Sequence, residues 1–373
     1  MLKVAIVASA LAAAGTTAYL VRSHDDAKTT VAAAPVAAHA TAVPLHYGTG
    51  AARRPALGPT APVRPSVARA ASVDDLAMLP ADSELVLGVD VARVEKSALW
   101  KQIVAPALLD APGLRDFEAD CGFDPIASLA SVTIGMKGMG KEHKDVSGAI
   151  VVHGFAKAKA FACITKRSAK HSTETELTID GDVMLVARDG VAHAAMTFLD
   201  DTTALIVIGP DASKDGIARI ADKRGGTSAA ASGYSDMIGE INTDDAVWLA
   251  VADGSPMLAK ANRKLAAHTP IQLHGLYGSI DFSDGLVINA GARTGSPAQV
   301  AKLVGDVQRQ IDQLVARGDL ANHFEQLDIN ADGGDVIISL AMTTGQLMAF
   351  AGNATAHVAE HVDHVAHHAA VAP

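Results

Sequence analysis

The 373-residue chain has few aromatic residues, only two cysteines and no long apolar run beyond its N-terminus. Aromatic residues make up 4% of the composition, which argues against an aromatic ligand cage or a base-stacking platform. Two cysteines are too few for a disulfide-rich scaffold or a four-thiolate zinc site. No stretch after residue 22 approaches the ~20 apolar residues of a spanning helix, which excludes a polytopic membrane protein. A formal charge of −10 argues against a general nucleic-acid binder.

The N-terminal segment, residues 4–21, is apolar or small throughout and lies between Lys3 and Arg22. One basic residue, an apolar stretch and a polar break are typical of a secretory signal or a signal anchor, and the sequence leaves both open. No cysteine follows the stretch, which disfavours a lipoprotein. We therefore expect residues 1–22 to direct export, and the protein to be periplasmic or anchored to the inner membrane by residues 4–21.

A low-complexity segment follows. Residues 29–72 contain 14 Ala and 6 Pro and no acidic residue, so they cannot bury enough apolar surface to offset their ordering entropy. We predict a disordered linker over residues 23–74. Residues 1–72 carry a net charge of +5 and the remainder −15. A basic tether beside an acidic body would favour an anionic membrane surface, although a simple solvated linker explains the same charges.

The body of the chain is predicted to be α+β. Alternating residues in ELVLGVDV (84–91) and AVWLAV (246–251) indicate an opening strand in each half, and a helix, a hairpin, a second helix and a second hairpin follow both. Ser255 and Ser296 begin helices in the second half, and Asp211 is expected to cap the helix that closes the first half.

Both halves read β-α-β-β-α-β-β-α, with extra strands in the first. QLDINADGGDVIISLA in the second half matches ELTIDGDVMLVA in the first, which favours a diverged duplication. We predict two repeats, residues 75–225 and 226–352, with antiparallel sheets and helices packed on one face. Two ordinary α+β layouts could also produce this order by coincidence.

The two cysteines, Cys121 and Cys163, both lie in the first half. In an oxidising compartment a single pair predicts one disulfide, although two buried free thiols would fit the same positions.

Two loops have the spacing of ligand-binding motifs but the wrong surroundings. GMKGMGK (135–141) has the glycine and lysine spacing of a phosphate-binding loop, yet Glu142 replaces the magnesium-binding hydroxyl and a strand follows, so a glycine hairpin explains it better. Asp328, Asn330, Asp332 and Gly333 match the first half of a calcium loop, but Ser339 stands where the bidentate glutamate belongs. A plain hairpin turn is the alternative.

Histidines concentrate in the C-terminal tail, residues 353–373. His357, His361, His364 and His368 recur at spacings of 4, 3 and 4, which would place them on one helix face, where Zn, Ni or Cu could bind. HVAEH within this run also matches an inverted zinc-protease motif with Glu360 as base, but no third ligand follows. The other interpretation is an Ala/His tail without function. We expect no other cofactor.

The segments LPADSELVLGVDVARVEKSALW and CGFDPIASLASVTIGM resemble a loosely defined group of bacterial exported proteins, over roughly residues 78–165. These proteins share a signal or anchor, a low-complexity spacer and this opening strand. The resemblance implies an envelope address and names no activity or functional residue.

No catalytic motif appears in the chain, so a non-enzymatic binding or scaffolding module is the expected function. The partner would be an envelope protein or a lipid-like ligand, held in an aliphatic groove between two curved sheets. Metal homeostasis through the tail is one alternative. A hydrolase is the other, and it would require a polar cleft around His153 or His274.

Overall fold

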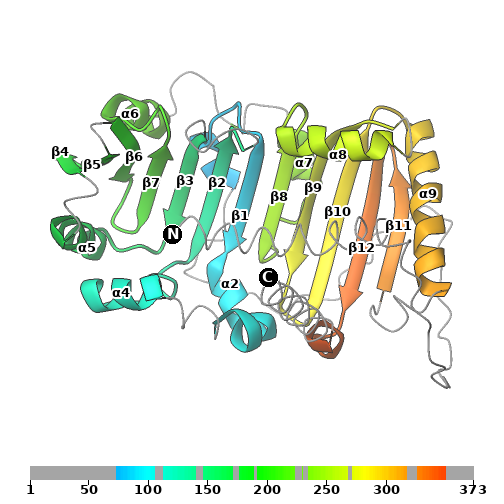
Figure 1. The fold of residues 1–373 in the computed structure, drawn as a ribbon, viewed down its shortest axis with the longest axis horizontal. Helices are drawn as coiled ribbons and strands as arrows, with labels where there is room; N and C mark the ends of the chain where they lie inside the picture. Colours follow the sequence, from blue (N-terminus) through cyan, green and yellow to red (C-terminus); the bar gives the residue numbers. More distant parts are fainter. Residues whose placement is uncertain are drawn as a thin grey trace, which may run out of the picture. The chain divides into compact units, whose positions relative to one another are not determined.

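The computed structural model describes residues 73–105, 112–139, 146–170, 176–188, 191–222, 229, 234–267, 271–316 and 326–349. Their twelve strands form one sheet, in the order β11-β12-β10-β9-β8-β1-β2-β3-β7-β6-β5-β4 (Figure 1). Neighbouring strands are antiparallel throughout. The strands are β1 (Leu85–Asp90), β2 (Ser131–Lys137), β3 (Ser147–His153), β4 (Glu176–Asp180), β5 (Val183–Arg188), β6 (Val191–Phe198), β7 (Thr203–Ile208), β8 (Val247–Ala252), β9 (Leu273–Asp281), β10 (Leu286–Thr294), β11 (Gln326–Asp332) and β12 (Asp335–Met342).

The α+β class is confirmed, but the prediction of separate sheets is wrong. The opening strand of the first half, β1, pairs with the opening strand of the second half, β8, from Leu85 opposite Val251 to Val89 opposite Val247. Both strands are rich in apolar residues on both faces, which is the pattern of a central strand covered from two sides. At the centre of one sheet, each of these two strands has a neighbouring strand on both sides.

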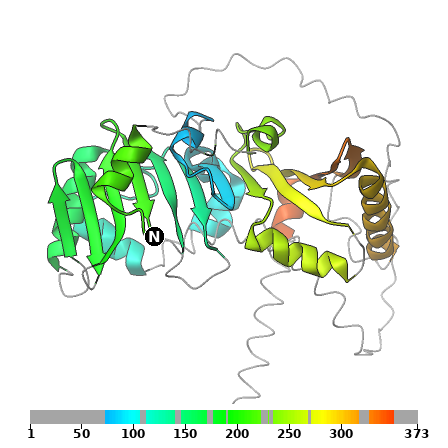
Figure 2. The ribbon, with the colours of Figure 1, turned by 90° about the horizontal axis from the view of Figure 1, so that it is seen from above.

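The prediction of helices on one face is also wrong for the described residues. We call face A the side of the sheet that carries Val86, Leu205 and Trp248, and face B the side that carries Leu87 and Val251. Face A is covered by η1 (Val73–Met78), α6 (Lys214–Ala221) and α7 (Tyr234–Gly239). Face B is covered by α5 (Lys157–Lys170), α8 (Pro256–Ala266) and α9 (Pro297–Ala316). Viewed from above, η1 and α7 lie on one side of the strands and α8 lies on the other (Figure 2).

The remaining helical segments follow β1. These are α2 (Val91–Lys96), the π-helical turn η2 (Trp100–Val104) and α4 (Pro112–Cys121). Residues 344–349 form a last helical turn after β12.

Helix starts follow their capping residues. Ser255 accepts a hydrogen bond from the backbone N–H of Leu258 at the start of α8, and Ser296 accepts one from the N–H of Gln299 at the start of α9, as predicted. The predicted cap of α6 is wrong: Ser213, not Asp211, accepts the hydrogen bond from Gly216. Asp211 instead forms an ion pair with Arg219 of α6.

One apolar core on face A extends across both halves of the chain. It includes Val86 and Leu205 from the first half and Trp248 and Tyr277 from the second. Trp248 is 1% exposed and its indole lies against Gly88 of β1, where a Cβ atom would be only 2.2 Å from the ring. The two halves therefore share their main core as well as their sheet.

In the part of the chain that the structure describes, no helix is long and apolar enough to cross a membrane. The predicted signal or anchor (residues 4–21) and the His-rich tail lie outside the described residues, as does the predicted linker apart from residues 73 and 74.

Candidate functional site

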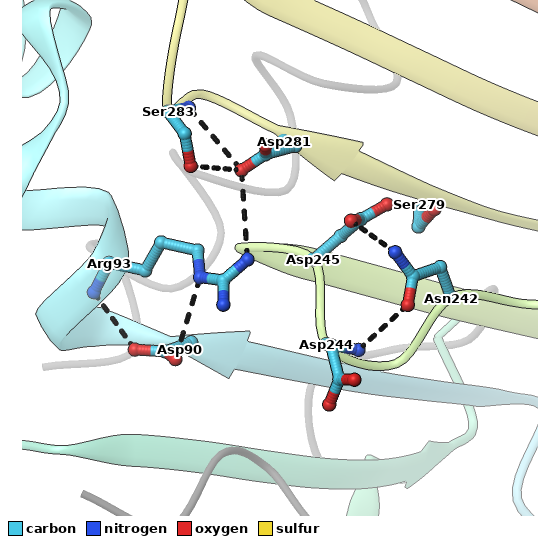
Figure 3. A network of polar contacts seen from close by, with 8 residues as sticks. All are labelled: Asp90, Arg93, Asn242, Asp244, Asp245, Ser279, Asp281 and Ser283. Atoms are coloured by element: carbon cyan, nitrogen blue, oxygen red, sulfur yellow. Dashed lines mark hydrogen bonds and ion pairs between the residues drawn. The ribbon is translucent and has the colours of Figure 1, made fainter. Parts of the chain in front are cut away.

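Polar side chains gather on face A where the two halves of the sheet meet (Figure 3). We call Asp90, Arg93, Asn242, Asp245, Ser279 and Asp281 the junction cluster. Asp90 caps α2 by accepting a hydrogen bond from the backbone N–H of Arg93 at 2.8 Å. The Arg93 guanidinium then lies 3.9 Å from the Asp90 carboxylate and 4.0 Å from that of Asp281 at the end of β9. Arg93 therefore connects a helix of the first half to a strand of the second.

Asp245 is the most buried carboxylate of the junction cluster, at 8% exposure. It accepts hydrogen bonds from the Ser279 hydroxyl and from the Asn242 amide, both at 2.6 Å. Burial away from water raises the pKa of Asp245, and the neighbouring Asp281 raises it further, while the Ser279 hydrogen bond and Arg93 act in the opposite direction. The loss of solvation outweighs the donors, so this carboxyl holds its proton to a higher pH than usual.

The junction cluster holds the two halves together. Asp245 ties the turn before β8 to β9, and Asp281 also accepts a hydrogen bond from the Ser283 hydroxyl at 2.8 Å. Within the described residues, no group of three or more His, Cys, Asp or Glu side chains is arranged to hold a metal ion. The polar contacts of this cluster link α2 to the β8–β9 strand pair.

A second cluster attaches η1 to the first half of the sheet. His153 Nε2 lies 3.0 Å from the Asp75 carboxylate, and His153 Nδ1 lies 3.2 Å from the Thr203 hydroxyl. Thr133 donates a further hydrogen bond to Asp75 at 2.8 Å. Asp75 is 4% exposed and Thr133 is fully buried, so this chain of contacts secures the first turn of the described body to β2, β3 and β7.

A third cluster lies on face A of the second half. The Tyr277 hydroxyl donates to Asp335 at 2.6 Å, and Arg293 forms an ion pair with the same carboxylate at 3.1 Å. The Arg293 guanidinium also stacks 5.7 Å from the centre of the Tyr277 ring. Burial raises the pKa of Tyr277, and its hydrogen bond to Asp335 raises it further, so the hydroxyl stays protonated and donates to the carboxylate. These residues join β9, β10 and β12.

The strand surface beyond this cluster is partly exposed: Val287 and Asn289 are exposed, whereas Ser339 is half-buried and Ile337 packs against the face A core. On face A of β10 and β12, Val287 is 38% exposed, and Asn289 accepts a hydrogen bond from the Ser339 hydroxyl at 3.0 Å. Asn289 lies opposite Ser339, and Gly291 lies opposite Ile337. We call Val287, Asn289, Ile337 and Ser339 the face A strip. It presents apolar and amide groups side by side, a mixture typical of protein and lipid-like binding surfaces.

The predicted disulfide is confirmed. Cys121 at the end of α4 is bonded to Cys163 of α5, with the two Cα atoms 4.8 Å apart. Arg167 of α5 also forms an ion pair with Asp120 at 3.1 Å, so the two helices are held together at one end. A disulfide of this kind is typical of an oxidising, exported compartment.

The two ligand-like motifs lie in hairpins. Asp328, Asn330 and Asp332 all point to face A of β11, each two residues from the next, and Gly333 forms the turn to β12 with a positive φ of 56°. Extended residues at this spacing are about 7 Å apart, so they do not converge on one cation as a calcium loop does. In GMKGMGK, residues 135–137 belong to β2, and Gly138 has a φ of 77° beyond its end.

The histidines singled out from the sequence have separate positions. His153 belongs to the cluster with Asp75, and His274 forms an ion pair with Asp253 at 2.9 Å on the surface. That hydrogen bond lowers the pKa of Asp253. The tail histidines His357, His361, His364 and His368 lie outside the described residues, so their metal binding stays a prediction.

Sequence reasoning missed all three polar clusters. Contacting members are up to 188 positions apart, as Arg93 and Asp281 are, and no spacing rule links them. One signal was available: His153 ends the buried strand β3, Asp245 comes just before β8 and Tyr277 lies within β9, and a polar side chain at such a position needs a partner.

Comparisons with known proteins identify no family. No family model matches the chain, and no curated protein sequence matches it. Crystal form III of TP0453 covers 76% of this chain and 99% of its own, with 12% identity and a TM-score of 0.46. Crystal form I covers 76% and 98%, with 11% identity and a TM-score of 0.45. These scores are too low to support an assignment of fold or function.

Proposed function

We propose that the protein is an exported or membrane-anchored envelope protein that acts as a non-enzymatic binding or scaffolding module. The observation that carries this proposal is the face A strip, where the exposed Val287 and Asn289 of β10 offer an apolar side chain beside hydrogen-bonding groups. The Cys121–Cys163 disulfide supports the exported address. The partner is an envelope protein or a lipid-like molecule.

For the described residues, the surface of the sheet is the proposed place for a lipid-like ligand. The described strands form one sheet, so they do not form the groove that was expected between two sheets. The cavity between α9 and β11, lined by Gln308, Ile311, Leu327 and Ile329, measures about 10 Å³. That volume suits one water molecule and is far too small for an acyl chain.

The proposed origin of this scaffold is a duplication. In the second half the strand order from the centre is β8-β9-β10-β12-β11, and in the first it is β1-β2-β3-β7-β6-β5-β4. If the β6–β7 hairpin is left out, the first-half order becomes β1-β2-β3-β5-β4, which matches the second-half order strand for strand. α5 follows β3, and α9 follows β10. Each of these strands is the second strand of the first hairpin in its half, and both helices pack on face B. A strand order shared in this way supports descent from one repeat.

Photo-crosslinking in the native envelope tests the binding surface. The full chain would carry Val287→p-benzoylphenylalanine, with Lys214→p-benzoylphenylalanine on α6 as the matched control on the same face. We expect a discrete adduct at position 287 that is absent at position 214. Native mass spectrometry of the purified protein then separates a lipid adduct from a protein partner. Identical labelling at both positions, together with an unliganded mass, would contradict the proposal.

A second candidate function, metal binding by the tail, is favoured by the regular spacing of its four histidines. Zinc titration of the full chain against a form truncated after residue 353 tests it. We expect binding only by the full chain, and equal binding by both forms would remove the tail from consideration.

A further inference from the structure

Two helices on face B carry only basic charge. α5 contains five basic and no acidic residues, and α8 contains three basic and no acidic residues. The chain beyond residue 72 has a net charge of −15, so eight positive charges in two helices on one side of the sheet stand out against their surroundings. α5 and α8 therefore differ in charge from the body as a whole, whereas α9, also on face B, carries two basic and two acidic residues.

Four of these basic side chains are exposed and form no ion pair with any described residue: Lys159 on α5, and Lys260, Arg263 and Lys264 on α8. Three further basic side chains of α5 have partners, among them Lys166, which donates to the Asp120 carbonyl at 2.6 Å. Lys157 forms an ion pair with Asp182 at 3.3 Å, and Arg167 forms one with Asp120. The unpaired charges remain available to an external anion.

The two helices present the same surface pattern. On α8, Met257, Lys260 and Lys264 share a face at spacings of 3 and 4, while Leu258 is buried against the sheet. On α5, Lys159 and Lys166 share an exposed face with Ala162 between them. Met257 is 42% exposed, a flexible apolar side chain on the same helix face as two lysines. Basic residues with an interspersed apolar side chain match the surface of a helix that lies on anionic lipid.

Local helix electrostatics explain only part of this charge. Arg263 and Lys264 lie in the last turn of α8, where the helix dipole favours cations. Lys157 and Lys159 lie in the first turn of α5, where the same dipole disfavours them. Lys159 has neither a favourable dipole nor a carboxylate partner among the described residues, and its side chain is exposed.

We propose that the outer surface of α5 and α8 docks the folded body onto an anionic phospholipid bilayer. Each basic residue beside such a surface strengthens binding roughly fivefold, and salt weakens the effect. This proposal rests on the envelope location proposed above, but it does not depend on any ligand of the face A strip.

Lysine footprinting of the full chain reconstituted in vesicles tests the docking. Acetylation by an N-hydroxysuccinimide ester is compared in phosphatidylcholine vesicles and in vesicles with about a third phosphatidylglycerol. We expect Lys159, Lys260 and Lys264 to react at least threefold more slowly on anionic vesicles, and Lys214 of α6 to react equally on both. High salt should remove the difference.

A variant pair separates charge placement from total charge. Arg263→Gln/Lys264→Gln should reduce the protection of Lys159 and Lys260, whereas Lys214→Gln/Arg219→Gln on α6 removes the same charge and should leave it unchanged. Equal labelling on both vesicle types would overturn the proposal. So would lipid-independent protection that grows with protein concentration, which would identify a second copy as the occupant. Neither result bears on the cross-link at Val287, so the proposed function can fail separately.

Discussion

At the scale of single residues, the contact between Gly88 and Trp248 sets the spacing at the centre of the sheet. A side chain at position 88 would enter the space that the indole occupies. The ring is buried between strands of both halves and has little freedom to move.

We therefore predict that Gly88→Ala lowers the free energy of unfolding by about 2 kcal/mol or more. Urea unfolding followed by circular dichroism measures the change. Gly239→Ala at the end of α7 is the matched control, because a Cβ atom there meets nothing within 4 Å. Equal stability of the two variants would show that the indole can shift.

Asp245 gives a prediction about pH. Burial raises its pKa in the folded state, so the folded protein holds this proton more tightly than the unfolded chain does. Its contribution to stability is then greatest below the unfolded carboxyl pKa, and it is lost as pH rises through the folded value.

Asp245→Asn cannot titrate, but its amide can keep hydrogen bonds to Asn242 and Ser279. We expect the stability of the variant relative to the wild type to increase from pH 3.5 to pH 7, by ~1.4 kcal/mol for each unit of raised pKa. Urea unfolding across this range measures it, with exposed Asp284→Asn as control. A difference that stays constant or falls with pH would refute the assignment.

At the scale of elements, the disulfide between α4 and α5 closes a loop across 42 positions. In the chain-entropy model a loop of this length stabilises the folded state by ~4 kcal/mol. The bond adds to the other contacts between α4 and α5, which include the Arg167–Asp120 ion pair, the hydrogen bond from Lys166 to the Asp120 carbonyl and the Arg167 guanidinium over the Phe117 ring.

We predict that Cys121→Ala/Cys163→Ala lowers the free energy of unfolding by about 3–4 kcal/mol, as measured in urea. Adding a reductant should bring the wild type to the stability of the double variant and should not affect that variant. A wild type that is insensitive to reductant and carries two free thiols by mass would contradict the bond.

Elements set by local signals were predictable. Ser255 and Ser296 begin helices through their own side chains, and Asp284–Gly285 and Asp332–Gly333 form turns that need only a glycine in the left-handed region. α7 was not predicted: it has only six residues, and Tyr234 is placed by a hydrogen bond from its hydroxyl to the Ser83 carbonyl, 151 positions away.

At the scale of the whole molecule, the pairing of β1 with β8 could not be predicted from the sequence. Two apolar opening strands are equally compatible with two sheets or one, and only the burial of Gly88 beneath Trp248 distinguishes them. The three polar clusters depend on this arrangement, because their partners meet only after distant strands have paired. Pattern and capping rules therefore identified most strands and helices, but not the surfaces between them.

A shared sheet and core predict cooperative unfolding. We expect far-UV circular dichroism and the fluorescence of Trp248, read in a Trp100→Phe background, to give coincident urea transitions. Adding Gly88→Ala at the junction should shift both signals together. Two separate transitions would show that the halves fold independently.

The outermost strands of the described sheet have a consequence for association between molecules. β4 carries Glu176 and Asp180, and β11 carries Asp328 and Asp332. An edge strand with unpaired backbone groups is a template for aggregation. Ile179 on β4 is 48% exposed, and this apolar side chain would favour pairing with another strand. Carboxylates along both margins oppose the addition of another acidic strand, including one from a second copy. Growth of the sheet by edge-to-edge pairing of identical copies is therefore disfavoured at both of these margins.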